Sequence, residues 1–182
     1  MKILVAYASS YGATKGIADS IGERLRQQGL QADVSAVDSV EEIRGYDAFV
    51  VGSALYMFHW MKEARKFVSK NKEVLSSHPT WLFSSGPVGT KATDAKGNDV
   101  LKVSGPKELE ELLAFTGARE HRVFFGALDG SKLKGMTGAF YRMARRSEEA
   151  RESMPEGDFR DWKLIEAWAD EIAAELKAPL QA

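Results

Sequence analysis

A hydroxyl-rich turn near the N-terminus has the residue types and spacing that capture a phosphate group. A short apolar run is followed by Ser9-Ser10-Tyr11-Gly12-Ala13-Thr14, and a helical pattern begins at once. The N-terminus of a helix offers unpaired backbone N–H groups and the positive end of a dipole, and both favour an anion. The hydroxyl groups of Ser9, Ser10 and Thr14 add donors, and Gly12 lets the backbone approach a ligand without a Cβ in the way.

The donors of this turn are neutral, which favours the phosphate of a bound cofactor over a phosphate that is transferred. Lys15 comes only after the turn. The stretch is neither a Walker loop nor a dinucleotide-binding fingerprint, because both glycine patterns are absent. On the turn alone, the alternative that Ser10 or Thr14 merely caps a helix is equally open.

Size and composition restrict the classes of protein that the chain can belong to. The 182 residues predict one domain, 1–182, of ordinary globular composition, 44% hydrophobic and 28% charged. A net charge of −1 argues against a dedicated nucleic-acid binder. The absence of cysteine excludes disulfides, a thiol nucleophile and a cysteine-ligated iron–sulfur cluster. With no signal peptide or membrane-spanning run in the pattern, we expect a cytoplasmic protein whose contact with a membrane is at most peripheral, at its inner face.

The elements that must position the turn alternate between strand and helix. The pattern predicts buried strands over 2–8, 47–53, 80–85 and 123–128, and a more exposed one over 31–37. It predicts helices over 14–28, 60–72, 107–115 and 161–176, a short helix over 41–44, and a polar loop over 88–105. Short apolar strands alternating with helices specify an α/β fold, in which a doubly wound, five-stranded parallel sheet is the middle of three layers.

Five such strands in an open sheet fit the order 2-1-3-4-5. In that order a ligand binds beyond the carboxyl ends of the strands, at the point where the strand order reverses. The informative loops should therefore follow strands one, three and four. They are the turn Ser9–Thr14, the aromatic segment Ser53–Trp60 and the glycine-containing segment Ser84–Gly89.

These three loops resemble those of flavodoxin-like proteins that bind FMN, over almost the whole chain. The first turn matches the phosphate loop Ser/Thr-x-x-Gly-x-Thr of that family. The closest similarity is to the flavodoxin-domain group that includes the flavin-dependent protoporphyrinogen IX dehydrogenase of bacteria. Three features carry it: Gly52–Tyr56 running into a helix, Phe125–Leu128, and an insertion that closes with Asp161-Trp162.

The resemblance implies FMN as cofactor, a flavodoxin-like strand order, and a site built from the three loops. The residues expected to hold the phosphate are Ser9, Ser10, Tyr11, Gly12, Ala13 and Thr14. Those expected to frame the ring are Ser53, Ala54, Leu55, Tyr56, Ser85, Gly86, Pro87, Val88 and Gly89, with the Gly86 and Gly89 N–H groups facing the flavin. No residue stands out as catalytic, and no metal site is expected.

The resemblance also implies an FMN-dependent oxidoreductase that takes electrons from a small reduced substrate, such as protoporphyrinogen IX, to a quinone-type acceptor. The first alternative is an electron carrier between protein partners. Such carriers are usually strongly acidic, and the net charge of −1 argues mildly against that role. The second alternative is a flavin-free interaction module that keeps the fold.

Several residues near these loops have two interpretations. Trp60 either stacks on the flavin or belongs to the core, and His59 is more typical of a surface residue than of a proton donor. The basic segment 132–146 is either a solvated amphipathic helix or a docking site for an anionic substrate, protein or lipid. Arg119, His121 and Arg122 are expected to precede the fifth strand and to be either structural or solvated.

Overall fold

A parallel β-sheet forms the middle layer of the molecule. The structure is a computed structural model that describes residues 1–133, 135–148, 151 and 155–178, without the side chains of residues 136, 137, 140 and 144. The strands run in the order β2-β1-β3-β5-β6. Their bounds are β1 Lys2–Ala8, β2 Gln31–Ala36, β3 Ala48–Tyr56, β5 Thr80–Ser85 and β6 Glu120–Phe124. Counted along the chain as parallel strands, this order is the predicted 2-1-3-4-5, and the predicted fold class is confirmed.

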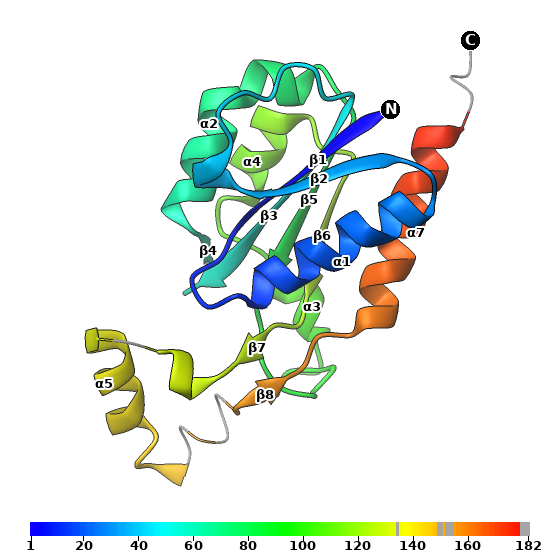
Figure 1. Cartoon of the computed structure of the whole chain (residues 1–182). Helices are drawn as coiled ribbons and strands as arrows, with labels where there is room; N and C mark the ends of the chain where they lie inside the picture. Colours follow the sequence, from blue (N-terminus) through cyan, green and yellow to red (C-terminus); the bar gives the residue numbers. More distant parts are fainter. Residues whose placement is uncertain (134, 149–150, 152–154, 179–182) are drawn as a thin grey trace.

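Helices cover both faces of this sheet. Figure 1 shows α1 (Ala13–Gln27) beside α7 (Trp162–Lys177) on one face, and α2 (Lys62–Ser76) with α4 (Leu109–Thr116) on the other. The central strands alternate their side chains between these two layers. On β1, Ile3 and Val5 pack toward α1 and α7, whereas Leu4 and Ala6 pack toward α2. This burial on both faces explains why the strands read as continuous apolar runs.

The helix layers follow the predicted periodicity, with small differences at their ends. Asp161 caps α7 by accepting a hydrogen bond from the Leu164 N–H, and the Leu164 side chain is exposed. Helix α2 begins at Lys62, because His59–Trp60 forms a short strand, β4, that pairs antiparallel with the end of β3. Within the predicted loop 88–105, Asp99 caps a short helix, α3 (Val100–Val103).

The short helix predicted over 41–44 is wrong. The helical turn in this region is the 3₁₀ helix η1, Val37–Ser39. The Glu42 carboxylate accepts hydrogen bonds from the backbone N–H groups of Ile43 and Arg44, both at 2.9 Å. A side chain that bonds its neighbouring backbone in this way favours a turn over a helix.

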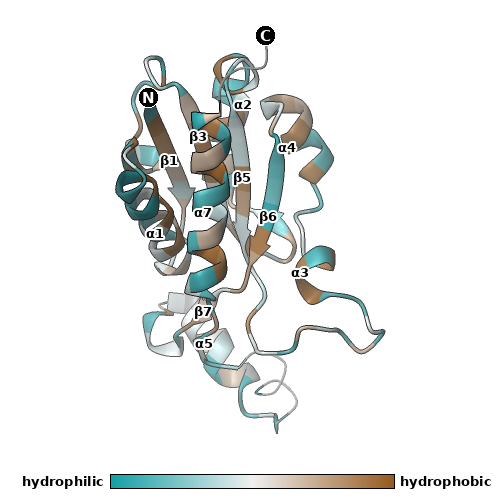
Figure 2. Cartoon of the chain, turned by 90° about the vertical axis from the view of Figure 1, so that its right-hand side faces the viewer, coloured by the Kyte–Doolittle hydropathy of each residue, from teal (hydrophilic) through white to brown (hydrophobic). Residues whose placement is uncertain are grey.

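The fifth strand was predicted over 123–128, but the parallel strand β6 ends at Phe124. Its first residues are polar because β6 is the edge of the sheet, and Figure 2 shows it hydrophilic over most of its length. The chain then leaves the sheet at Gly126, whose N–H donates to the Pro87 carbonyl oxygen. Residues Ala127–Leu128 form β7, which pairs antiparallel with β8, Gly157–Asp158. His121 and Arg122, expected to precede the fifth strand, therefore lie within it.

The segment between β7 and β8 lies beyond the carboxyl ends of the parallel strands. It contains the 3₁₀ helix η2 (Gly130–Lys132) and helix α5 (Gly135–Ala144), at the bottom of Figure 1. Met143 of α5 is exposed, whereas Lys134 and the side chains of Met136 and Phe140 lie outside the described residues. No helix in the described ranges combines the length and the hydropathy needed to cross a membrane.

Candidate functional site

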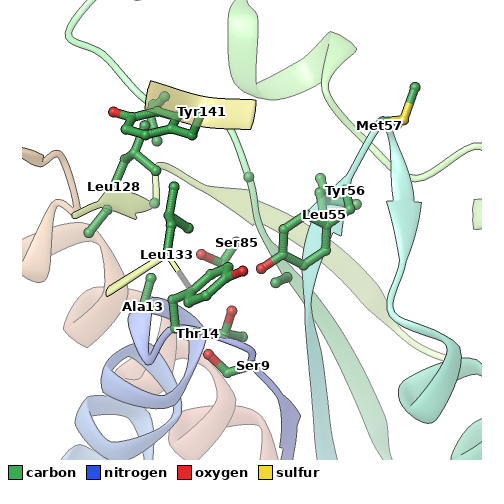
Figure 3. A pocket seen from close by; sticks show the side chains of 16 residues that line it. Ser9, Ala13, Thr14, Leu55, Tyr56, Met57, Ser85, Leu128, Leu133 and Tyr141 are labelled. Atoms are coloured by element: carbon green, nitrogen blue, oxygen red, sulfur yellow. The ribbon is translucent and has the colours of Figure 1, made fainter. Parts of the chain in front are cut away.

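The three predicted loops meet around one cavity of about 490 Å³ beyond the carboxyl ends of β1, β3 and β5. A cavity of this size falls in the range typical of cofactor sites. In Figure 3, Ser9 and Thr14 lie at one end of the cavity, Leu55 and Tyr56 at one side, and Leu128, Leu133 and Tyr141 across from them. The other lining residues are Tyr11, Ala13, Ala54, Met57, Ser85, Gly86, Val88, Gly126 and Ala127. Among the described residues that line it, none carries a formal charge.

The end of the cavity formed by α1 has the properties of an anion site. Thr14 is 0% exposed, and its Oγ1 has no hydrogen-bond partner in the described part of the chain. A buried hydroxyl without a partner is costly, so a missing ligand is a natural explanation. In the same described part, no side chain caps α1 and no acidic residue lies in its first turn, so its N–H groups and dipole remain open to an anion.

Glycine is required at the N-cap of α1. Gly12 has φ +91°, in the left-handed region, and a Cβ there would meet no atom within 4 Å. The Gly12 N–H donates to Ser9 Oγ at 3.0 Å, which fixes the turn so that Ser9 and Tyr11 line the cavity. The free space beside Gly12 and the unpartnered Thr14 hydroxyl together form a cradle that fits a phosphate.

A hairpin between β3 and β4 forms one wall of the cavity. Tyr56 lines it, half exposed, and burial raises the pKa of its hydroxyl, although a hydrogen bond with Ser10 opposes the shift. Met57 and Phe58, at the tip, have φ values of 51° and 64°. Non-glycine residues in this left-handed region cost roughly 1–3 kcal/mol each, and such strain gathers at functional sites. This wall therefore depends on surrounding contacts to hold its conformation.

The loop after β5 forms the floor, with Ser85, Gly86 and Val88 lining the cavity. The Gly86 N–H was expected to face a flavin, but it donates to the Phe124 carbonyl oxygen at 3.1 Å. Because β6 continues beside this loop, the backbone donor is already used within the sheet. Gly89, with φ +120°, does not line the cavity.

The side facing Tyr56 is one that the sequence did not predict. Leu128, Leu133 and Tyr141 come from the insertion after β6. Tyr141 is 7% exposed, donates to Glu156 Oε1 at 3.0 Å, and has a pKa raised chiefly by burial. The sequence signal for this side is the run Gly126-Ala127-Leu128, which carries part of the family resemblance and lines the cavity.

Five of the predicted site residues do not line the main cavity: Ser10, Gly12, Ser53, Pro87 and Gly89. Gly12 lines a smaller neighbouring cavity of about 120 Å³. Ser53 is buried, donates to the Ala54 carbonyl oxygen and accepts from the Met61 N–H, so it holds the hairpin rather than facing the cavity. Ser10 reaches the sulfur of Met61 at 3.8 Å.

Trp60 belongs to the core. It is 1% exposed, and its Nε1 donates to Ser84 Oγ at 2.8 Å. The Ser84 Oγ is also 2.8 Å from His121 Nε2, so Trp60, Ser84 and His121 form a hydrogen-bond chain behind the cavity floor. His59, half exposed, lies against Glu108.

No group of three or more His, Asp or Glu side chains in the described ranges is placed to hold a metal ion. The lining consists of hydroxyls, aromatic rings and aliphatic side chains, which suits a planar organic cofactor with one anionic end. Such a site can bind, orient and exclude water, while the bound group supplies the reactive atoms.

Known proteins resemble this chain in sequence and in fold. Residues 4–153 match the flavodoxin domain. The protoporphyrinogen IX dehydrogenase [quinone] of Escherichia coli K12 is 32% identical over 93 residues, which cover 50% of this chain and 51% of that protein. The chain thus spans about half the length of the curated relatives it matches.

Solved structures share the fold at lower identity. The rubredoxin:oxygen oxidoreductase of Desulfovibrio gigas has a TM-score of 0.62 at 17% identity, covering 100% of this chain and 37% of that one. A flavodoxin variant from Pseudomonas aeruginosa has a TM-score of 0.60 at 18% identity, covering 98% and 100%. Since the family match spans most of the residues and the sheet order agrees, the chain belongs to the flavodoxin domain family, which implies a flavin cofactor.

Proposed function

We propose that the main cavity binds FMN, with the phosphate at the N-terminus of α1 and the ring between the hairpin and the insertion. The observation that carries this proposal is the buried, unpartnered Thr14 hydroxyl beside the uncapped helix terminus. A phosphate at that place would supply the missing partner and interact favourably with the helix dipole. Ser9 through Thr14 would form this end of the site, as the sequence predicts.

The apolar walls suit a ring system that must be kept from water. Tyr56 on one side and Leu128, Leu133 and Tyr141 on the other offer aromatic and aliphatic surface to a flat ring. When bound, the flavin supplies the electron-accepting and electron-donating chemistry. The side chains around it determine its orientation and its contact with solvent.

We infer that the protein is an FMN-dependent oxidoreductase that resembles protoporphyrinogen IX dehydrogenase. It would take electrons from a reduced organic substrate and deliver them to a quinone-type acceptor. The 32% identity to that dehydrogenase over about half of each chain supports this class. The insertion supports it too, because Leu128, Leu133 and Tyr141 give the cavity a second apolar side, against which a small organic substrate can pack. A cytoplasmic location, with at most peripheral membrane contact, remains a prediction.

The second candidate is an electron carrier between proteins. The likeness to flavodoxins supports this role. So does the exposed tip of the hairpin, where Met57 is 87% exposed and Phe58 53% exposed at the edge of the cavity. Apolar side chains at such a rim suit transient contact with a partner protein.

The two candidates are separated by two assays on the FMN-loaded protein. The first follows anaerobic oxidation of protoporphyrinogen IX with a soluble quinone, against an equal concentration of free FMN. The second follows electron relay from a flavodoxin reductase to cytochrome c. The enzyme proposal predicts oxidation faster than with free FMN. Relay without faster oxidation would contradict it and favour the carrier.

A further inference from the structure

Glu108, at the start of α4, makes contacts that its position in the helix does not explain. It occupies the N-cap position, where a shorter side chain such as that of Asp accepts hydrogen bonds from the first N–H groups of the helix. In the described residues, the Glu108 side chain caps none of those N–H groups and instead reaches the hairpin. There its Oε1 accepts the Trp60 N–H at 2.7 Å, and its Oε2 lies 2.8 Å from His59 Nδ1.

The Glu108 carboxylate is nearly enclosed. Its side chain is 9% exposed, and Arg65 Nε lies 3.7 Å from Oε1. Desolvation raises the pKa of this carboxyl, but hydrogen bonds from the Trp60 N–H, from its own backbone N–H and from His59 outweigh it, so the pKa lies below its usual range. Glu108 is therefore a mostly buried anion with partners on the hairpin and on α2.

The hairpin that it contacts needs such support. Two consecutive residues at its tip, Met57 and Phe58, hold positive φ angles, which persist only where surrounding contacts impose them. The backbone before Glu108 adds one more contact, since the Lys107 N–H donates to the Phe58 carbonyl oxygen at 2.8 Å. Residues 107 and 108 thus contact the hairpin at three points, one at its tip and two on its returning arm.

The other arm of the same hairpin carries Tyr56, which lines the main cavity. Tyr56 and His59 are paired directly across the hairpin, so a shift of one displaces the other. We propose that Glu108 is a positioning residue for the cofactor site, holding the hairpin so that Tyr56 and Met57 form the wall against the flavin ring. This inference rests on the proposed FMN site. It predicts that Glu108 affects binding of the flavin ring and leaves binding of the phosphate unchanged.

The first test measures how strongly Glu108 holds the hairpin in the protein without flavin. Hydrogen exchange is followed by mass spectrometry in wild type, Glu108→Ala, Glu108→Gln and the control Glu111→Ala, an exposed residue one helical turn further along. Glu108→Ala should exchange faster over residues 57–61, while peptides of β1 and β5 remain unchanged. Glu108→Gln keeps an acceptor for the Trp60 N–H and should restore much of the protection.

The second test measures the affinities of the same proteins for FMN and for riboflavin, which lacks the phosphate. Glu108→Ala should weaken both ligands by the same factor, about tenfold, because it affects the ring end only. Glu108→Gln should bind within about threefold of wild type, and Glu111→Ala should match wild type.

The outcomes separate this inference from the proposed function. Unchanged affinities in Glu108→Ala, or a loss confined to FMN, would overturn the role of Glu108 while FMN binding by wild type stands. Equal loss in Glu111→Ala would overturn it as well. A wild-type protein that binds neither ligand would overturn the FMN proposal and this inference together.

Discussion

Replacement of Thr14 by Val is expected to weaken FMN binding by about 10- to 100-fold and to leave the unliganded protein at least as stable as wild type. The Thr14 side chain is 0% exposed, and its hydroxyl has no partner within the described residues. Val has nearly the same shape, so it removes an unsatisfied polar group without opening a cavity. A hydrogen bond to a charged phosphate is lost only in the complex, so the two effects have opposite signs.

This prediction is checked by titration with FMN and riboflavin and by urea unfolding of the unliganded protein. Riboflavin binding should change little, because Thr14 is assigned to the phosphate end. Thr116→Val is a matched control, since this buried hydroxyl donates to the Leu112 carbonyl oxygen at 2.8 Å. It should lose about 1 kcal/mol of stability and keep its FMN affinity. A Thr14→Val protein that binds FMN like wild type would contradict the assignment.

Lowering the pH is expected to destabilise the fold through His121. Burial lowers the pKa of this imidazole from 6.5 to about 4, partly offset by Glu120. A neutral His121 ring suits this hydrogen-bond chain. The Trp60 Nε1–H is a donor only, so Ser84 Oγ accepts from it, and the hydroxyl hydrogen of Ser84 then donates to His121 Nε2. Protonation in the folded state removes that acceptor.

His121 binds its proton at a higher pH in the unfolded protein than in the folded protein. Between pH 6.5 and pH 4, unfolded His121 binds a proton that folded His121 does not, so stability falls as the pH falls through this window. The full effect is up to about 3 kcal/mol, present above pH 6.5 and lost below pH 4. Carboxylates also titrate in this range, so the quantity to measure is the difference between wild type and His121→Gln in urea unfolding at several pH values. Parallel pH curves for the two proteins would show that His121 contributes nothing.

The fold was largely predictable because the hydrophobic pattern of each strand and helix agrees with its place in the three-layer packing. The central strands are apolar on both faces, and each is followed by a helix whose buried face repeats at helical spacing. The three loops that form most of the cavity follow β1, β3 and β5, so the strand order alone brings them together. The short helix predicted over 41–44 is wrong for a local reason, because the Glu42 carboxylate accepts hydrogen bonds from the backbone N–H groups of the next two residues.

The remaining features depend on contacts that are distant in sequence. The continuous apolar run Val123–Leu128 hides the point at which the chain leaves the sheet, because Gly126 turns only by bonding Pro87. Tyr141 lines the cavity while its hydroxyl donates to Glu156 and accepts from Arg145. Glu108 reads as an ordinary helix-start residue, and its contact with Trp60 appears only when α4 packs beside the hairpin. Periodicity contains none of this information.

FMN binding in the main cavity is tested most directly by the visible absorption spectrum of the purified protein, before and after FMN is added and unbound FMN is removed by desalting. We expect the flavin bands to remain, at about one FMN per chain, in wild type, and to be much weaker in Thr14→Val after the same treatment. A folded wild-type protein that retains no flavin would contradict the account and leave an α/β interaction module without a redox function.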